Sequence, residues 1–150
     1  MQAEGEFDIR VPIQEVWDSL WNSETLPIWV PGCTQASLDG RNVRAVVEQS
    51  VAFLKARFEL DVAVAEADPP HRVAFEGGGK DPKIASQVKM TMKLDLAEAA
   101  AEVTHVRFRS DFQVFGRIAT IGQFVIQLKA KEIEKELIQK VRATLEKGAA

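Results

Sequence analysis

The sequence predicts one α+β domain, in which a long C-terminal helix lies across a curved antiparallel sheet of about six to seven strands. Two observations predict it. Apolar and polar residues alternate with a period of two over much of the first 116 positions, and the period then becomes 3.6. A chain of 150 residues fits a single domain over positions 1–150, without internal repeats or linkers.

The first 32 residues predict one strand and two short helices. Positions 3–9 alternate between small or apolar residues and charged ones, which is typical of a half-buried strand. Pro12 suits the first position of a helix, and apolar residues follow at helical spacing up to Trp21. A second helix over Thr25–Trp29 is expected to end at Pro31 and Gly32.

Further alternating segments have one apolar and one charged face, as in an antiparallel sheet with one side facing water. These segments are Val43–Val51, Phe58–Val64, Val73–Gly77, Val88–Leu96 and Val106–Val114. The glycines at 77–79, followed by Lys80, lack the spacing of a phosphate-binding loop. A mobile hairpin loop is expected there.

Beyond Gly116 the apolar positions form one stripe of a helix that is expected to end near Lys147. The stripe comprises Ile118, Ile121, Gly122, Val125, Leu128, Ile133, Leu137, Val141 and Leu145. Some 30 helical residues would reach about 45 Å, enough to cross the sheet. The opposite face, with Lys129, Glu134 and Lys140, mixes charges and predicts a solvated surface. Gly122 costs a helix about 1 kcal/mol relative to alanine, so it indicates either close packing or room for a ligand.

Composition and charge exclude several classes of protein. A net charge of −3 disfavours a nucleic-acid partner, which would require a basic surface. No apolar run approaches the roughly 20 residues that span a bilayer, and the N-terminal residues do not resemble a signal peptide. Cys33 is the single cysteine, so no internal disulfide can form. A soluble cytoplasmic protein is expected.

The residues that could carry catalysis are few. Cys33, His71 and His105 do not have the spacing of metal ligands, and neither histidine is placed by the sequence beside the cysteine. The acidic residues are scattered over outward faces, with no inward pair to act as acid and base. We therefore expect no enzyme activity, no catalytic residue, no metal and no cofactor.

The inner face of the expected sheet is the candidate ligand site. Core packing accounts for most of its residues, and a cavity lined by some of them is the alternative, because ligand pockets are mostly apolar with few polar groups. The Ser110 hydroxyl needs a partner there, which could be backbone, water or a ligand carbonyl. Trp29 could either pack inside or be exposed to a partner protein. The candidate ligand-binding residues are Phe58, Phe75, Met90, Met92, Phe108, Ser110, Phe112, Ile118, Ile121, Gly122, Val125 and Leu128.

Several local motifs occur in a characteristic order. They are Val11-Pro12 with Val16-Trp17, then Val30-Pro31-Gly32-Cys33, Asp68-Pro69-Pro70, and Phe115-Gly116-Arg117 before Ile121-Gly122. In this order the chain resembles the carbon monoxide dehydrogenase CoxG family of the START/Bet v 1-like (SRPBCC) superfamily. The resemblance implies a helix-grip fold enclosing an apolar cavity.

The same resemblance implies a non-catalytic role. A hydrophobic ligand, a quinone or lipid, would be bound in support of a carbon monoxide dehydrogenase-type molybdenum hydroxylase. The support would consist of maturation, membrane recruitment or electron-acceptor supply, at the inner face of the membrane. Peripheral membrane contact is expected without an anchor in this chain. Two alternatives stay open: an enzyme resembling the polyketide cyclases of the superfamily, for which Ser110 is the visible inward polar group, and a protein-interaction module with a filled core.

Overall fold

The computed structural model describes residues 1–40 and 42–146, and within them seven strands form one antiparallel sheet. The order across the sheet is β1-β7-β6-β5-β4-β3-β2, so β1 and β2 are its edges. The strands are β1 (Gln2–Ile9), β2 (Cys33–Asp39), β3 (Asn42–Val51), β4 (Leu54–Asp68), β5 (Arg72–Asp81), β6 (Ser86–Ala100) and β7 (Val103–Gly116).

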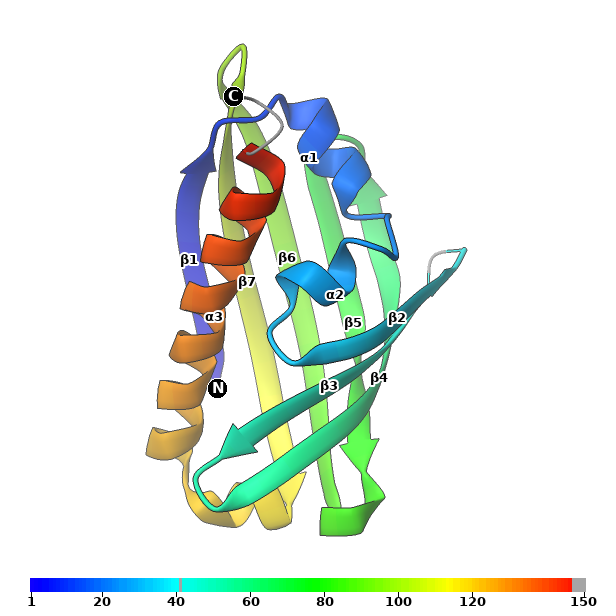
Figure 1. Ribbon diagram of the computed structural model, residues 1–150, viewed down its shortest axis with the longest axis vertical. Coiled ribbons are helices and arrows are strands. Elements are labelled where there is room, and N and C mark those ends of the chain that lie inside the picture. Colours follow the sequence, from blue (N-terminus) through cyan, green and yellow to red (C-terminus); the bar gives the residue numbers. More distant parts are fainter. Residues whose placement is uncertain (41, 147–150) are drawn as a thin grey trace.

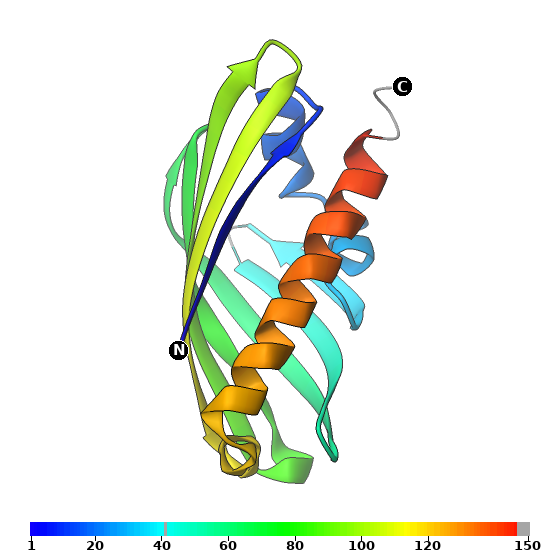
Figure 2. The same ribbon diagram turned by 90° about the vertical axis from the view of Figure 1, so that its left-hand side faces the viewer.

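Three α-helices and two short 3₁₀ helices complete the domain. The α-helices are α1 (Ile13–Ser19), α2 (Leu26–Trp29) and α3 (Gln123–Leu145), and the 3₁₀ helices are η1 (Pro82–Ile84) and η2 (Arg117–Ile121). The sheet curls so that α1, α2 and α3 lie on its inner side, with α3 running beside β1 and β7 (Figures 1 and 2). This is the α+β arrangement with a long C-terminal helix that the sequence predicts. No helix in the described ranges is both long and apolar enough to cross a membrane.

One expectation about the sheet is wrong, and one strand lies outside the predicted segments. The glycines at 77–79 are not a loop: they lie inside β5, paired with both β4 and β6. A side chain at Gly77 or Gly78 would collide with the carbonyl oxygen of Asp61 or Val88, so the neighbouring strands approach unusually closely there. The turn between β5 and β6 is instead η1. The edge strand β2 is not among the predicted segments, because its sequence, Cys33–Asp39, consists mostly of small and polar residues and carries little apolar alternation.

The long helix is shorter than predicted. Gly122 adopts φ +105°, a value that favours glycine, and separates η2 from α3. The α-helix therefore has 23 residues and a length of about 35 Å. Gly122 is a break between two helices rather than a position within one, and Lys147 lies outside the described residues.

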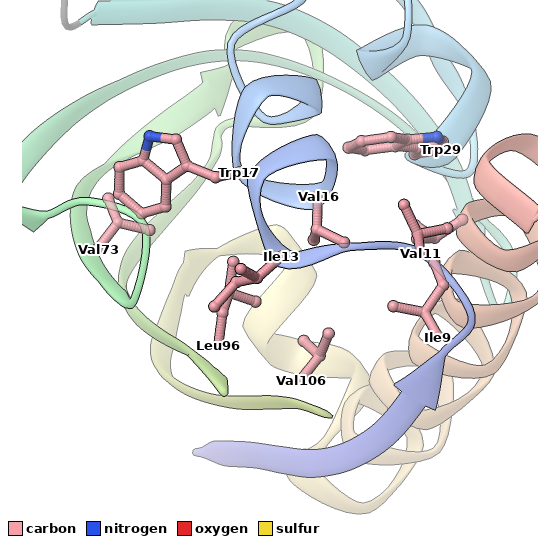
Figure 3. Close-up of a cluster of buried hydrophobic side chains, with 10 residues drawn as sticks. Ile9, Val11, Ile13, Val16, Trp17, Trp29, Val73, Leu96 and Val106 are labelled. Carbon is pink, nitrogen blue, oxygen red and sulfur yellow. The ribbon is translucent and has the colours of Figure 1, made fainter. Parts of the chain in front are cut away.

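One end of the domain holds a tightly packed core. Buried side chains from β1, α1, α2, the upper ends of β5–β7 and the last turns of α3 meet there (Figure 3). They are Ile9, Val11, Ile13, Val16, Trp17, Trp29, Val73, Leu96, Val106 and Val141. Trp17 and Trp21 pack edge to face at 5.6 Å between ring centroids, as their spacing of four residues predicts.

A smaller packed region closes the opposite end, where the β3–β4 turn, η1 and η2 lie (Figure 1). Buried polar groups join its segments. Asp81 accepts hydrogen bonds from the backbone N–H groups of Arg57 (2.8 Å) and Lys83 (3.0 Å). Ser86 donates to the carbonyl oxygen of Ile84 and accepts from the N–H of Ile118 at 2.9 Å. The middle of the inner face lies between these two ends.

Candidate functional site: the inner face of the sheet

The middle of the inner face is apolar and incompletely covered. Its side chains come from alternate positions of β4–β7, and the register aligns them in rows across the sheet. Met92, for example, lies between Phe75 on β5 and Ser110 on β7. Among the predicted site residues of this face, Phe58, Phe75, Met90, Met92, Phe108 and Phe112 are each half-buried rather than buried. Solvent-sized molecules therefore still reach these side chains.

Ser110 is the buried polar side chain of this face. It is 7% exposed and lies between Phe108 and Phe112 on the same side of β7. The sequence places a hydroxyl on an otherwise apolar wall, and the structure brings this hydroxyl to the middle of the wall. A buried hydroxyl in such surroundings is stabilised by any acceptor or donor that comes within reach.

The helical side of the site differs from the prediction. Ile121, Gly122 and Val125 are half-buried, whereas Ile118 is buried at the closed end. The expectation that Leu128 faces the sheet is wrong, because its side chain is 53% exposed. The break at Gly122 changes which residues of α3 face the sheet. Ile126 is therefore buried, although it is not part of the apolar stripe predicted for a continuous helix.

Packing against neighbouring elements explains the positions of two of the predicted ligand-binding residues, Phe75 and Phe108. The Phe75 ring lies 6.0 Å from the ring of Trp21 and extends the core at the packed end. Phe108 lies beneath α3, where its ring tip fills the space above Gly5 of the edge strand β1. This packing does not account for the polar side chain of Ser110 or for the half-covered side chains of Phe58, Met90, Met92 and Phe112.

The sequence pattern predicts Glu134 on the solvated face of the helix, and this prediction is wrong. Glu134 is half-buried, and its Oε1 atom lies so close to Gly5 that an added Cβ would be 2.7 Å from it. Partial burial raises the pKa of this carboxyl, and Lys131 opposes the rise. Its position one turn before Leu137, which packs on the core, was the signal that could have revealed this.

Trp29 is buried, so of the two alternatives that the sequence left open, packing inside the domain is the correct one. The side chain is 5% exposed, yet its indole Nε1 has no hydrogen-bond partner, and it is the one sealed side-chain nitrogen or oxygen of the described residues in this condition. The element α2 packs against both α3 and β2, and no local pattern in the sequence signals this packing.

The remaining reactive groups do not converge. Cys33 begins β2, and burial raises the pKa of its thiol. His105 lies on the outer face of β7, where its Nδ1 is 2.6 Å from Asp8 and its Nε2 is 3.2 Å from Glu6. Among residues 1–40 and 42–146, no group of three or more His, Cys, Asp or Glu side chains could hold a metal ion.

The outer side of the sheet carries a shallow hollow of about 1020 Å³ over the glycine run of β5. Its rim includes the carboxylates of Glu59, Asp61 and Asp111 and the ammonium groups of Lys80 and Lys89, all exposed. Charges of both signs in open solvent do not form a site for an apolar molecule. The inner face therefore has the better chemistry for a ligand, although the outer hollow is larger than a typical small-molecule site.

A long helix packed on the inner side of a curled seven-stranded antiparallel sheet defines the helix-grip class of START-like proteins. Residues 5–146 match the family model of the carbon monoxide dehydrogenase protein CoxG, and the chain belongs to this family. No protein of curated function matches the sequence.

Solved structures confirm the fold. A conserved protein from Geobacillus kaustophilus is similar with 22% identity and a TM-score of 0.87, over 98% of this chain and 96% of that one. A START superfamily protein from Mycobacterium smegmatis has 12% identity and a TM-score of 0.74, over 97% of each chain. The Zhui aromatase/cyclase from a Streptomyces species has 13% identity and a TM-score of 0.74, over 100% of this chain and 96% of that one. Identities this low show the fold alone.

Proposed function

We propose that this CoxG-family protein binds a hydrophobic small molecule between the sheet and α3 and does not catalyse a reaction on it. The observation that carries the proposal is the half-covered apolar wall formed by Phe58, Met90, Met92 and Phe112. Each buried CH₂ is worth about 0.8 kcal/mol, so a fold that leaves such a wall accessible forgoes stability that a bound lipophile would restore.

The proposed partner system follows from the family. Membership of the CoxG family supports a role beside a carbon monoxide dehydrogenase-type molybdenum hydroxylase. The ligand would be a quinone or a lipid, and the role would be maturation, membrane recruitment or electron-acceptor supply. Adding the protein to the hydroxylase encoded in the same genome should raise the rate at which that enzyme reduces a menaquinone analogue. An unchanged rate at saturating protein would exclude electron-acceptor supply.

The closed end of the domain has the composition of a surface that meets anionic lipid. Phe53 in the β3–β4 turn is 75% exposed, and Phe124 in the first turn of α3 is 74% exposed. The segments 50–56, 82–90 and 114–131 of this end contain six basic residues and no acidic one. Exposed aromatic rings within a basic surface favour the interface of a negatively charged bilayer.

Ligand binding is tested by titrating the purified protein with a short-chain menaquinone analogue while recording tryptophan fluorescence. Saturable quenching is expected. Met92→Gln places an amide on the inner wall and should weaken binding, whereas Thr91→Gln changes the next residue of the same strand, on the outer face, and should not. Equal affinities of the two variants, at equal folded stability, would contradict the proposed location.

A second candidate function, a cyclase-like enzyme, is favoured by one observation. Glu134 and Ser110 bring a carboxyl and a hydroxyl to the inner side, and such groups could move a proton on a bound polyketone. Incubation with a reactive poly-β-ketone, followed by product analysis for wild type and Glu134→Gln, separates the two functions. The leading proposal expects no turnover above the uncatalysed rate for either protein.

A further inference from the structure

The indole N–H of Trp29 is an exception among the buried polar groups of the domain. Thr104, fully buried, donates to the carbonyl oxygen of Val11 at 2.7 Å, and Asp81 and Ser86 have the partners described above. Trp29 alone among the described residues keeps a sealed donor without a partner. More than about nine in ten buried polar groups in proteins are paired, and an unpaired one costs about 1–3 kcal/mol.

The surroundings of this donor restrict what could pair with it. Trp29 belongs to the packed core with Ile9, Val11 and Val141, and Figure 3 shows its nitrogen at the end of the ring nearer α3. A trapped water needs two to four polar partners, and the buried side chains of this core are apolar apart from the indole nitrogens of Trp17 and Trp29. A charged group would lose its hydration without a counter-ion. The missing partner is therefore an oxygen on a neutral, apolar molecule.

A carbonyl oxygen meets this requirement better than a hydroxyl. It accepts a hydrogen bond and brings no donor of its own, whereas a hydroxyl would bring a second unpaired donor into an apolar environment. Because the nitrogen is sealed in this structure and α2 packs against α3, a ligand oxygen reaches it only when the groups that cover it move. The four-residue α2 is the smaller element of this pair, and its shift would open the contact.

We propose that Trp29 determines the ligand class of the inner site by donating its indole N–H to the carbonyl oxygen of a neutral lipophile. This inference rests on the proposed ligand-binding function and deepens it, since it distinguishes carbonyl-bearing lipophiles from hydrocarbons of equal size. Trp29 is then a specificity-determining residue, because a site built around a hydrogen-bond donor rejects analogues that leave this donor unpaired.

The test uses two matched probes and the three tryptophans of the chain. The probes are a prenylated 1,4-naphthoquinone and the naphthalene hydrocarbon with the same prenyl chain. Indole N–H signals of ¹⁵N-tryptophan-labelled protein are assigned with single Trp→Phe variants. The quinone is expected to move the Trp29 signal to lower field, and the hydrocarbon is not. Wild-type protein suffices for this measurement, so it does not depend on the folding of a variant.

Affinities complete the test. Trp29→Phe should weaken quinone binding by about tenfold and leave hydrocarbon binding within about twofold. Trp17→Phe, which alters the same core without touching the unpaired donor, should preserve the preference for the quinone. If the quinone binds but leaves the Trp29 signal in place, or if Trp29→Phe keeps the preference, the role of Trp29 is refuted while ligand binding stands. If neither probe binds the wild type, the proposed function itself is refuted.

Discussion

Arg142, near the end of α3, donates from Nε and Nη2 to the carbonyl oxygen of Asp8 at 3.2 and 3.1 Å. Its guanidinium also lies over the ring of Phe7, 5.5 Å from the centroid, and Glu146 accepts the backbone N–H of Arg10 at 2.8 Å. These contacts fasten the last turns of the helix to the edge strand β1. The first turn of α3, which follows Gly122 and exposes Phe124, has no comparable attachment among these bonds.

Loss of the two hydrogen bonds from the Arg142 guanidinium to Asp8 should therefore weaken the attachment of α3 to β1. Arg142→Ala is expected to lower the free energy of unfolding by about 1 kcal/mol, a modest value because the side chain is exposed. Arg142→Lys keeps the charge but cannot donate in the same bidentate geometry, so it should recover only part of the loss. Urea denaturation of the three proteins measures this. Full recovery by lysine would show that charge alone stabilises the contact.

Thr104 offers a sharper test, since it is fully buried and donates to the carbonyl oxygen of Val11. Thr104→Val is nearly isosteric but leaves that carbonyl without its partner, and it should cost about 1–3 kcal/mol in unfolding free energy. Thr104→Ser keeps the hydroxyl and loses a methyl group, at a cost of about 1 kcal/mol. If serine proved as costly as valine or more so, packing rather than hydrogen bonding would dominate at this position.

Gly32, in the Pro-Gly-Cys motif that leads into β2, should be harder to replace than the turn glycine Gly40. It adopts φ +81°, and an added Cβ would collide with the carbonyl oxygen of Glu48. Gly32→Ala is expected to destabilise the domain by roughly 3 kcal/mol or more. Gly40 has φ +60° and open space around it, so Gly40→Ala carries only the backbone cost of about 1 kcal/mol. Thermal unfolding compares the pair, and equal losses would contradict the collision.

His105 should make stability depend on pH. Hydrogen bonds to the carboxylates of Asp8 and Glu6 raise the pKa of His105 above its ordinary value. Its stabilising contribution is therefore complete below the unfolded-state pKa of about 6.5 and is lost as pH rises through the higher folded-state pKa. The stability difference between wild type and His105→Gln should be larger at pH 5.5 than at pH 8.5. Replacing both acids by their amides should remove this difference, and its persistence would assign the effect to another group.

Membrane contact at the closed end predicts a response to vesicle composition. Phe53→Ser combined with Phe124→Ser should reduce co-sedimentation with vesicles rich in anionic phospholipid several-fold. Ile28 on α2 is also exposed but lies away from this end, so Ile28→Ser is a matched control that should sediment like wild type. Equal sedimentation of all three proteins would refute the proposed surface.

The sequence predicts those elements whose buried residues recur at the regular spacing of a strand or a helix. Strands β3, β4, β6 and β7 carry alternating apolar residues on their inner faces. The change from the period of a strand to that of a helix is visible at Gly116. The glycine run in β5 has no side chains with which to show a period, so it resembled a loop. The phase of α3 was obscured by Gly122, whose positive φ is a property of the backbone, and this is why Leu128 was placed inward and Glu134 outward.

The candidate site was predictable in composition but not in detail. Alternation identified Met90, Met92, Ser110 and Phe112 as inward residues. It could not distinguish them from Phe75, whose neighbour Trp21 lies in the turn after α1, about 50 positions away in the sequence. The unpaired donor of Trp29 belongs to α2, whose packing against α3 and β2 is tertiary and leaves no local pattern in the sequence.

The concentration of the packed core at one end of the sheet has an evolutionary consequence. Substitutions at Phe58, Met90 or Phe112 leave Ile9, Val73 and Val106 in place, so they can alter what the inner wall accepts while the domain still folds. The part of the binding preference that depends on these wall residues is then selected nearly independently of folding. A lineage built on this architecture can exchange one lipophile for another through a few neutral steps, without first acquiring a stabilising mutation elsewhere.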